Sequence, residues 1–437
     1  MSRLLVLGYT LPSLISPENT VVPRAFNLRT AQFVDALLQA GHQLLVCCYL
    51  HPGETVPAGL YPLNKDNLRC VAAGPGSRAW LQSARQEFHS FHPDALVAVS
   101  LLGCLVASQL PGGKPLWCDI YGDPITDLQM LLSARGYNRG LRSVLWLESV
   151  ALRRGDAFST CSNPQRCALI GKLSSLLRLD YRTLEYQFVH AIPPAFVLGG
   201  AVGSRKVEVY PQLWGSGPFN VLWYGGYNGW ADVDTLFEAL EYAMEHDERI
   251  HYTSLGEGIA DPSLYQRFAE NVRRSQYADR YHLLGWRPSS ELREFIAKSH
   301  LGISVLRNIY ETELGAPTRL LEMLSLGLPV LTVGSELSGW LASKGAALSA
   351  PYADPTSVAE AILSCAANPQ KWQGLSQRGL EVVSGELSAS ETSLPLTRWA
   401  AAPTKAPDRD IDWRGLVEDR GLRIFQRISW QFLSTYW

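Results

Sequence analysis

The sequence lacks the features of a membrane-spanning or zinc-binding protein. It has no run of about 18 apolar residues, the length that a helix needs to cross a bilayer. Its eight cysteines form no C-x-x-C pair, and no cysteine or histidine is spaced as zinc ligands are. Several cysteines lie in apolar stretches, so we expect buried free thiols in a reducing compartment and no bound metal.

A strong charge of one sign is also absent. The 437 residues carry a net charge of −2, so no global basic field would recruit nucleic acid. The chain starts with a strand-like segment, Arg3 to Gly8, where a secreted protein would have a charged and apolar leader. We therefore expect a cytoplasmic protein, in which any membrane contact would come from the surface of the folded chain.

Strand-like and helical segments alternate along the chain, which is typical of α/β domains. The length suits two domains, and 46% apolar against 18% charged residues is enough material for their cores. In the first half, apolar segments such as Leu4–Leu7 and Ala95–Val99 alternate with helical periodicity such as Arg24–Gln39. This alternation predicts doubly wound parallel sheets.

A stretch rich in glycine and proline, residues 191–217, interrupts the alternation and predicts an interdomain linker. The alternation restarts with an apolar segment at Asn220–Tyr224. We therefore place an N-terminal domain at residues 1–195 and a C-terminal domain at residues 196–400, facing each other across a cleft. Ligands of such sheets bind beyond the carboxyl ends of the strands.

The chain ends in an amphipathic segment within residues 410–437. In a predicted helix over Asp419–Trp437, apolar side chains form one stripe and arginines form another. Such a helix suits either an anionic membrane surface, which would be the inner surface for a cytoplasmic protein, or packing back on the N-terminal domain. We favour the packing role and keep peripheral membrane contact as the alternative.

The most informative motif is a short predicted helix followed by a strand, within residues 315–332. Pro317 suits the first helical turn, where its missing N–H would be unpaired, and Gly327 suits the left-handed residue just past the helix end. Arg319 and Glu322 lie on one face of this helix. A guanidinium can bind phosphate in a fork, and a carboxylate can accept hydrogen bonds from a ribose diol. The pair predicts a nucleotide-sugar site, and the alternative is an ordinary surface pair.

This helix also provides the strongest resemblance to a known family. The donor-site helix of the GT-B glycosyltransferases, in the family-4-like group (glycosyl transferases group 1), resembles the block Pro317-x-Arg319-Leu-x-Glu322-x-Leu-x-x-Gly327-x-Pro329-Val330. In that group a basic residue meets the diphosphate and a glutamate holds the ribose. The resemblance covers most of the chain. It implies two Rossmann-like domains facing a cleft, with the acceptor bound by the N-terminal domain and the donor by the C-terminal one.

Two further segments extend the resemblance. The turn Gly256-Glu257-Gly258 resembles the turn after the second strand of the donor domain, and Leu283–Leu292 resembles the segment over which the nucleotide base lies. The resemblance therefore implies a donor site that consists of Gly226, Gly256, Trp286, Arg287, Gly315, Ala316, Pro317, Thr318, Arg319 and Glu322.

The sequence departs from the family pattern in the turn after the first strand of the C-terminal domain. Family members commonly have a Gly-Arg turn and a nearby lysine there, whereas Gly225–Asp232 contains no cation. Arg319 and backbone N–H groups would then hold more of the phosphate charge. Arg287 or Arg307 could assist them.

Two acidic residues are candidates for catalysis. The first glutamate of the family motif is displaced, so that either Glu313 or Glu311 could lie near the donor sugar, and we choose Glu313. Asp123 follows a predicted strand of the N-terminal domain and could orient an acceptor hydroxyl or accept its proton. The alternative for Asp123 is a turn formed before Pro124.

Together these features predict a glycosyltransferase, of the hexosyltransferase type, in carbohydrate biosynthesis. Its donor would be a UDP-, GDP- or dTDP-linked sugar, its acceptor a sugar, a lipid-linked molecule or a small molecule, and its chemistry would need neither a metal nor another cofactor. One alternative is a sugar-nucleotide epimerase of the same fold, which would need several carboxylates and a histidine in the cleft. Another is a non-catalytic nucleotide-binding partner subunit, because the usual cations are missing.

Overall fold

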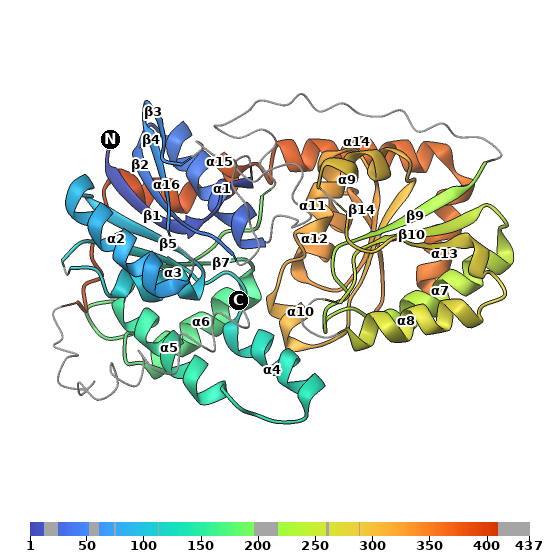
Figure 1. Ribbon diagram of the computed structural model, residues 1–437, viewed down its shortest axis with the longest axis horizontal. Coiled ribbons are helices and arrows are strands. Elements are labelled where there is room, and N and C mark those ends of the chain that lie inside the picture. The colour runs from blue at the N-terminus through green and yellow to red at the C-terminus, as the bar shows by residue number, and fades with distance from the viewer. Residues whose placement is uncertain are drawn as a thin grey trace.

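Two α/β domains lie side by side in the computed structural model (Figure 1). The residues that it describes are 1–12, 25–51, 61–73, 76–111, 113–195, 217–258, 262–287 and 289–409. One sheet of eight strands forms the centre of the N-terminal domain, and one of six strands forms the centre of the C-terminal domain. The predicted fold class, two doubly wound Rossmann-like domains, is confirmed.

The N-terminal sheet is parallel except at one edge. In spatial order its strands are β3 (Leu63–Lys65), β4 (Leu68–Ala72), β2 (Gln43–Tyr49), β1 (Arg3–Tyr9), β5 (Ala95–Val99), β6 (Leu116–Asp119), β7 (Ala157–Thr160) and β8 (Val189–Ala191). Only the pair β3–β4 is antiparallel among these strands. The central strands are continuous apolar runs because helices cover both of their faces.

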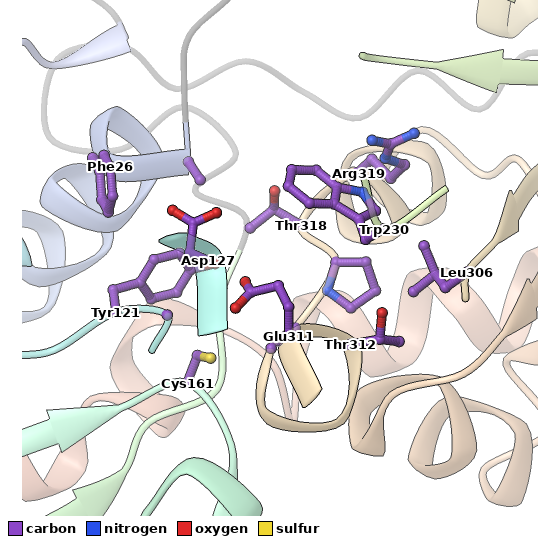
Figure 2. A pocket seen from close by; sticks show the side chains of 15 residues that line it. Phe26, Tyr121, Asp127, Cys161, Trp230, Leu306, Glu311, Thr312, Thr318 and Arg319 are labelled. Carbon is purple, nitrogen blue, oxygen red and sulfur yellow. The ribbon is translucent and has the colours of Figure 1, made fainter. Parts of the chain in front are cut away.

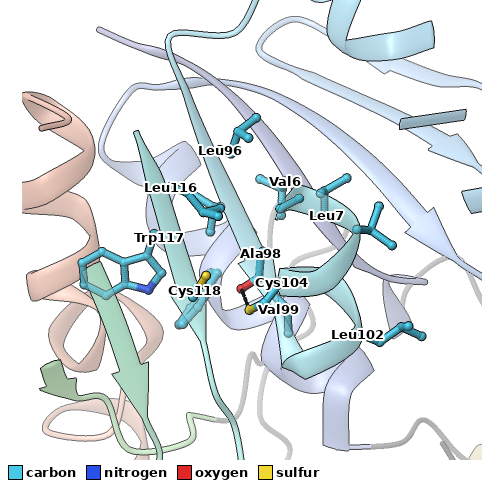
Figure 3. Close-up of a cluster of buried hydrophobic side chains, with 14 of the residues drawn as sticks. Val6, Leu7, Leu96, Ala98, Val99, Leu102, Cys104, Leu116, Trp117 and Cys118 are labelled. Atoms are coloured by element: carbon cyan, nitrogen blue, oxygen red, sulfur yellow. Dashed lines mark hydrogen bonds between the residues drawn. The ribbon is translucent and has the colours of Figure 1, made fainter. Parts of the chain in front are cut away.

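Helices from the same half of the chain pack on this sheet and on one another (Figure 1). They are α1 (Ala25–Gln39), α2 (Ser77–Phe91), α3 (Ser100–Ser108), α4 (Pro124–Arg135), α5 (Leu141–Arg154) and α6 (Asn163–Ser175). Figure 3 shows part of the resulting core, in which Cys104 and Cys118 pack among aliphatic side chains. The thiol of Cys104 donates to the carbonyl oxygen of Ala98 at 3.8 Å. Of the eight cysteines all are free and only Cys167 is exposed, so the expectation of mostly buried free thiols is confirmed.

The C-terminal sheet is parallel throughout its described strands. Their spatial order is β11 (Tyr281–Leu283), β10 (Ile250–Leu255), β9 (Phe219–Tyr224), β12 (Leu301–Val305), β13 (Val330–Val333) and β14 (Ala347–Ala350). One hydrophobic cluster joins this sheet to α7 (Val233–His246), α8 (Ser263–Arg274) and α13 (Pro355–Ala367). A second joins it to α9 (Ser289–Ala297), α11 (Arg319–Ser325), α12 (Glu336–Ser343) and α14 (Pro369–Ser384).

The chain returns to the N-terminal domain earlier than the sequence predicts. Two short helices, α15 (Ala389–Thr392) and α16 (Leu394–Ala401), lie beside the N-terminal sheet in Figure 1. The hydroxyl of Ser2 donates to the Ala400 carbonyl oxygen at 2.7 Å. The predicted C-terminal domain, 196–400, therefore includes residues that pack on the N-terminal core. The predicted helix within 410–437 lies outside the described residues.

Two local features bear on the site. Helix α11 begins at Arg319. Pro317 therefore precedes the helix, whereas the sequence predicted it in the first helical turn. Gly327 has φ 76°, the left-handed conformation predicted for the residue after the helix. None of the described helices combines the length and the apolar character needed to cross a membrane.

Candidate active site

A cavity of about 330 Å³ lies between the two domains (Figure 2). Its N-terminal-domain wall consists of Ala25, Phe26, Tyr121, Gly122, Asp127 and Cys161, and its C-terminal-domain wall of Trp230, Leu306, Glu311, Thr312 and residues 315–319. Tyr121, Cys161 and Leu306 come just after the carboxyl ends of β6, β7 and β12. Because doubly wound sheets bind ligands at this edge, the cavity is the candidate active site.

A tight turn carries the predicted donor motif into this cavity. The structure places five of the predicted donor residues along the wall: Gly315, Ala316, Pro317, Thr318 and Arg319. The turn requires glycine at position 315, since a Cβ there would lie 2.6 Å from the carbonyl oxygen of Glu311. The Gly315 N–H donates to that same oxygen at 2.9 Å.

Arg319 places a partly satisfied guanidinium at the end of the cavity. Its Nη2 donates to the Gly226 carbonyl oxygen at 3.1 Å, and its Cζ lies 4.8 Å from the centre of the Trp223 ring. Its Nη1 is buried and has no hydrogen-bond partner among the described residues. Burial lowers the pKa of Arg319 to about 10, so the group is still a cation at neutral pH.

Two hydroxyl groups in the same cavity are also without partners. The buried Tyr121 hydroxyl and the buried Thr312 Oγ1 make no hydrogen bond within the described part of the chain. The Tyr121 ring is held in place by the guanidinium of Arg29, whose Cζ lies 5.0 Å from the ring centre. Buried polar groups normally have partners, so three such groups around one cavity favour a site that binds a polar ligand.

Two carboxyl groups from opposite domains share the cavity. Figure 2 shows Asp127, on α4, and Glu311, on α10 (Tyr310–Leu314), on either side of it. The Thr126 hydroxyl donates to Glu311 Oε2 at 2.6 Å, a hydrogen bond between the domains. Burial and the neighbouring Asp123 raise the pKa of Asp127 to about 6. Burial and the Asp127 charge raise the pKa of Glu311 well above its usual value.

Further hydrogen bonds between the domains close the cleft around this pair. The Ser162 hydroxyl donates to the Leu314 carbonyl oxygen at 2.6 Å. On the outer side, the backbone N–H and the side-chain amide of Asn163 donate to the Glu336 carboxylate at 2.8 and 3.0 Å. The described conformation is therefore one in which α6 contacts both α10 and α12.

Asp123, the predicted catalytic aspartate, is used for structure. Its Oδ1 accepts hydrogen bonds from the N–H groups of Ile125 and Thr126, which caps α4, and its Oδ2 accepts from Lys172 Nζ at 2.5 Å. Asp123 is only 4% exposed and does not line the cavity. The geometry favours the alternative, a cap before Pro124, and places Asp127 in the cavity one helical turn further on.

Glu313, the chosen catalytic glutamate, points away from the cavity. It is exposed and lines a different, more open groove, whereas Glu311 lines the cavity. Residues two positions apart point to different sides of a helical turn, so only one of them can face the donor. The displaced spacing before Glu322 identified both candidates but could not decide between them.

Glu322 lies behind Arg319 and does not line the cavity. It is half-buried on α11. Burial raises the pKa of Glu322 to about 7, although a hydrogen bond from the Tyr224 hydroxyl and the charge of Arg293 oppose the rise. Its role in holding a ribose stays a prediction, because the side chain already has a partner within the protein.

The other predicted donor residues lie on neighbouring turns of the C-terminal domain. A Cβ on Gly256 would lie 2.4 Å from the Gly225 carbonyl oxygen, so these two turns pack backbone against backbone beside Gly226. Trp286 is half-buried and Arg287 is exposed. Neither lines the cavity, and their contact with a base stays a prediction.

Comparison with known proteins agrees with the fold. Residues 218–368 match the sequence model of the family described as glycosyl transferases group 1. No curated protein sequence matches the chain.

Solved structures are similar over nearly the whole chain. Sucrose-phosphate synthase from Thermosynechococcus elongatus has a TM-score of 0.62 at 14% identity, covering 92% of this chain and 98% of that one. The trehalose-6-phosphate synthase OtsA has a TM-score of 0.66 at 12% identity, covering 92% and 100%. Anabaena Alr3699/HepE, solved in complex with UDP and glucose, has a TM-score of 0.60 at 13% identity, covering 92% and 100%.

The fold that these structures share with this chain is the GT-B fold of glycosyltransferases. The match to glycosyl transferases group 1 lies within its C-terminal domain. The epimerase alternative calls for a histidine in the cleft, and none of the described lining residues is a histidine. Within the described ranges, no three histidine, cysteine, aspartate or glutamate side chains are placed to share a metal ion.

Proposed function

We propose that this enzyme transfers a sugar from a uridine-diphosphate sugar to an acceptor hydroxyl in the cavity between its domains. The observation that supports this most is the buried cation of Arg319, a residue that lines the cavity and whose Nη1 has no partner among the described residues. A doubly charged diphosphate is the ligand that would satisfy it. Uridine is preferred over guanosine or thymidine because the HepE structure holds UDP and glucose.

Arg319 would act mainly on the leaving group. When the bond between sugar and diphosphate breaks, negative charge grows on the phosphate oxygen. A fixed guanidinium in a site shielded from water stabilises that charge more than bulk water does. We propose that this makes the transfer independent of a metal ion, because Arg319 supplies the positive charge. Glu322, about one turn further along the same helix, would hold the ribose.

The carboxyl pair, Asp127 and Glu311, would act where the acceptor hydroxyl loses its proton and attacks the sugar. A base works best when its pKa lies near the operating pH, and the pKa of Asp127 is about 6. We assign Asp127, on the N-terminal domain, to accept the proton of the attacking hydroxyl. Glu311, held by Thr126, would face the sugar from the donor domain. Tyr121 and Thr312 would donate hydrogen bonds to sugar hydroxyls.

The closed arrangement of the two domains has a chemical purpose in this proposal. The hydrogen bonds from Ser162 to Leu314 and from Asn163 to Glu336 hold the domains together around the cavity. Water that entered would hydrolyse the activated sugar, and closure excludes it.

Calorimetry with the full-length protein tests the donor site. UDP, GDP and dTDP are titrated separately, with and without EDTA, and UDP-glucose is then followed for slow hydrolysis without an acceptor. We expect UDP to bind more tightly than GDP or dTDP, EDTA to change nothing, and hydrolysis to release glucose and UDP. If no nucleotide binds, the proposal is wrong and the non-catalytic alternative gains support. If EDTA abolishes binding or hydrolysis, metal independence is wrong.

A further inference from the structure

A second, larger space opens beside the cavity, and the function proposed above does not use it. This groove, of about 700 Å³, lies between α4 with the turn after it and the segment that leads from β12 into α10. Its volume is within the range of about 300–1,000 Å³ typical of small-molecule sites. Glu311 lines both the cavity and the groove, so a ligand in the groove lies next to the carboxyl pair.

The volumes suggest how two substrates are divided between these spaces. At about 330 Å³, the cavity is at the lower end of that range and holds one ligand of ordinary size. If the donor sugar and its diphosphate fill the cavity, the acceptor must approach from an adjoining space. The groove adjoins it at Glu311 and has the room.

The side chains on the groove walls show which chemistry the acceptor has. Tyr137 and Tyr310 stand on opposite walls and are 48% and 66% exposed, which is unusual for large aromatic side chains in this protein. Neither ring has a ring contact within the described part of the chain. A tyrosine ring offers an apolar face with a polar end, which matches the C–H faces and hydroxyl edges of a sugar.

Neutral hydrogen-bonding groups lie between the two rings. The side chains of Gln129, Ser133, Asn138 and Asn308 line the groove, and none makes a hydrogen bond within the described residues. Amide and hydroxyl groups can each donate and accept, as the hydroxyls of a sugar do.

The charges in the groove nearly cancel. Arg307 brings one positive charge and Glu313 one negative charge, and Glu311, whose pKa is raised, adds a second carboxyl group. The guanidinium of Arg307 also donates to the Gly229 carbonyl oxygen at 3.1 Å. A groove built for a phosphate would carry a clear excess of positive charge.

From these observations we infer that the groove binds the acceptor, and that the acceptor is a neutral oligosaccharide. Its non-reacting sugar units lie between Tyr137 and Tyr310, and its reacting end passes Glu311 into the cavity. The inference rests on the proposed function and narrows it by naming the class of acceptor.

Saturation-transfer NMR on the full-length protein tests this inference. Maltotriose, cellotriose and chitotriose are each mixed with the protein, with and without UDP, and glucose 6-phosphate serves as an anionic comparison. We expect at least one trisaccharide to receive saturation. We expect the affinity obtained by titrating that signal to fall at least about fivefold in Tyr137→Ala and Tyr310→Ala, which is about 1 kcal/mol. Tyr181, an exposed tyrosine of the N-terminal domain outside the groove, provides the matched control, and Tyr181→Ala should keep the signal.

The outcomes separate this inference from the proposed function. If UDP binds but no trisaccharide receives saturation, the groove assignment is wrong and the donor site stands. Stronger saturation of glucose 6-phosphate than of any trisaccharide overturns the neutral acceptor. A trisaccharide signal unchanged in both groove variants places that ligand elsewhere. If UDP does not bind, the proposed function fails, and the groove is still judged by the samples without UDP.

Discussion

The replacement of Arg319 by methionine is the most informative test of the donor site. Methionine keeps a long unbranched stem over Trp223 but removes the cation. In the unliganded protein Nη2 is already bonded to the Gly226 carbonyl oxygen, so Nη1 is the amino group left for a phosphate. A hydrogen bond between charged groups contributes about 1.5–3 kcal/mol. Losing one should therefore weaken UDP binding roughly 10- to 150-fold.

The same substitution should have little effect on folding. The buried, unpartnered Nη1 costs the unliganded protein about 1–3 kcal/mol, while stacking of the guanidinium on Trp223 contributes about 0.5–2 kcal/mol. These contributions oppose each other. We therefore expect the free energy of unfolding of Arg319→Met to stay within about 1 kcal/mol of the wild-type value.

Two measurements on the same samples decide the result. Calorimetry gives the affinity for UDP, and urea denaturation gives the free energy of unfolding. Arg319→Lys should fall between the wild type and Arg319→Met, because it keeps the charge but loses the planar fork. Arg273→Met, on the exposed surface of α8, is the matched control and should change neither quantity. A folded Arg319→Met variant that binds UDP within about threefold of wild type would refute the reasoning, because a contact of about 1.5 kcal/mol would be missing.

Four further predictions follow from the geometry. Because the pKa of Asp127 is about 6 and its charged form is the proposed base, kcat/KM should fall as the pH drops through 6, and Asp127→Asn should lose this acid limb. Glu311→Gln should lower kcat by at least about 10²-fold, whereas Glu313→Gln, which faces the groove, should keep the donor-hydrolysis rate. With the pKa of Glu322 at about 7, the affinity for UDP should rise from pH 6 to pH 8, and Glu322→Gln should bind UDP more weakly by about 1–3 kcal/mol without this pH dependence. Arg178→Met should lower the free energy of unfolding by about 3–5 kcal/mol, because it leaves the buried carboxylate of Asp408, its ion-pair partner from the C-terminal end of the described chain, unpaired.

Each of these predictions has a contrary outcome. An acid limb that persists in Asp127→Asn assigns the base to another group. Equal losses of donor hydrolysis in Glu311→Gln and Glu313→Gln contradict the assignment of Glu311, which lines the cavity, and not Glu313, to the donor sugar. An affinity for UDP that does not change between pH 6 and pH 8 removes Glu322 from the ribose site. An unfolding free energy of Arg178→Met close to wild type would show that the return of the chain to the N-terminal domain does not depend on this ion pair.

Much of the fold could be predicted from local patterns. Central strands such as β1 and β12 are short apolar runs, and the apolar character follows from burial on both faces. The edge strand β3 was not predicted, because only one of its three residues is even half-buried and its sequence carries no alternating pattern. The sequence also predicted that the chain returns to the N-terminal domain only within residues 410–437, whereas α16 already packs there, and the reason is related. Whether a short helix packs on one domain or the other depends on contacts with residues hundreds of positions away, such as Ser2.

Part of the candidate site could also be predicted from local sequence patterns, and part of it could not. The motif of Gly315 to Arg319 was found because its turn, its cation and its glycine are encoded in consecutive residues. Asp123 was chosen as the catalytic aspartate, and Asp127 was not considered. An aspartate before a proline is equally suited to capping a helix, and Asp123 caps α4 in the structure. Burial is the larger cause of the raised pKa of Asp127, ahead of the charge of Asp123, and the burial of a side chain is decided by the tertiary structure.

The sequence by itself determined two doubly wound sheets and one helix start with an arginine suited to phosphate, since each depends on neighbouring residues along the chain. Only the tertiary structure decided which carboxyl groups face each other, which hydroxyls are left without partners, and where a second groove opens. The physical reason is that burial and the approach of charges depend on distances across the cleft between the domains, and those distances are set by the packing of whole domains.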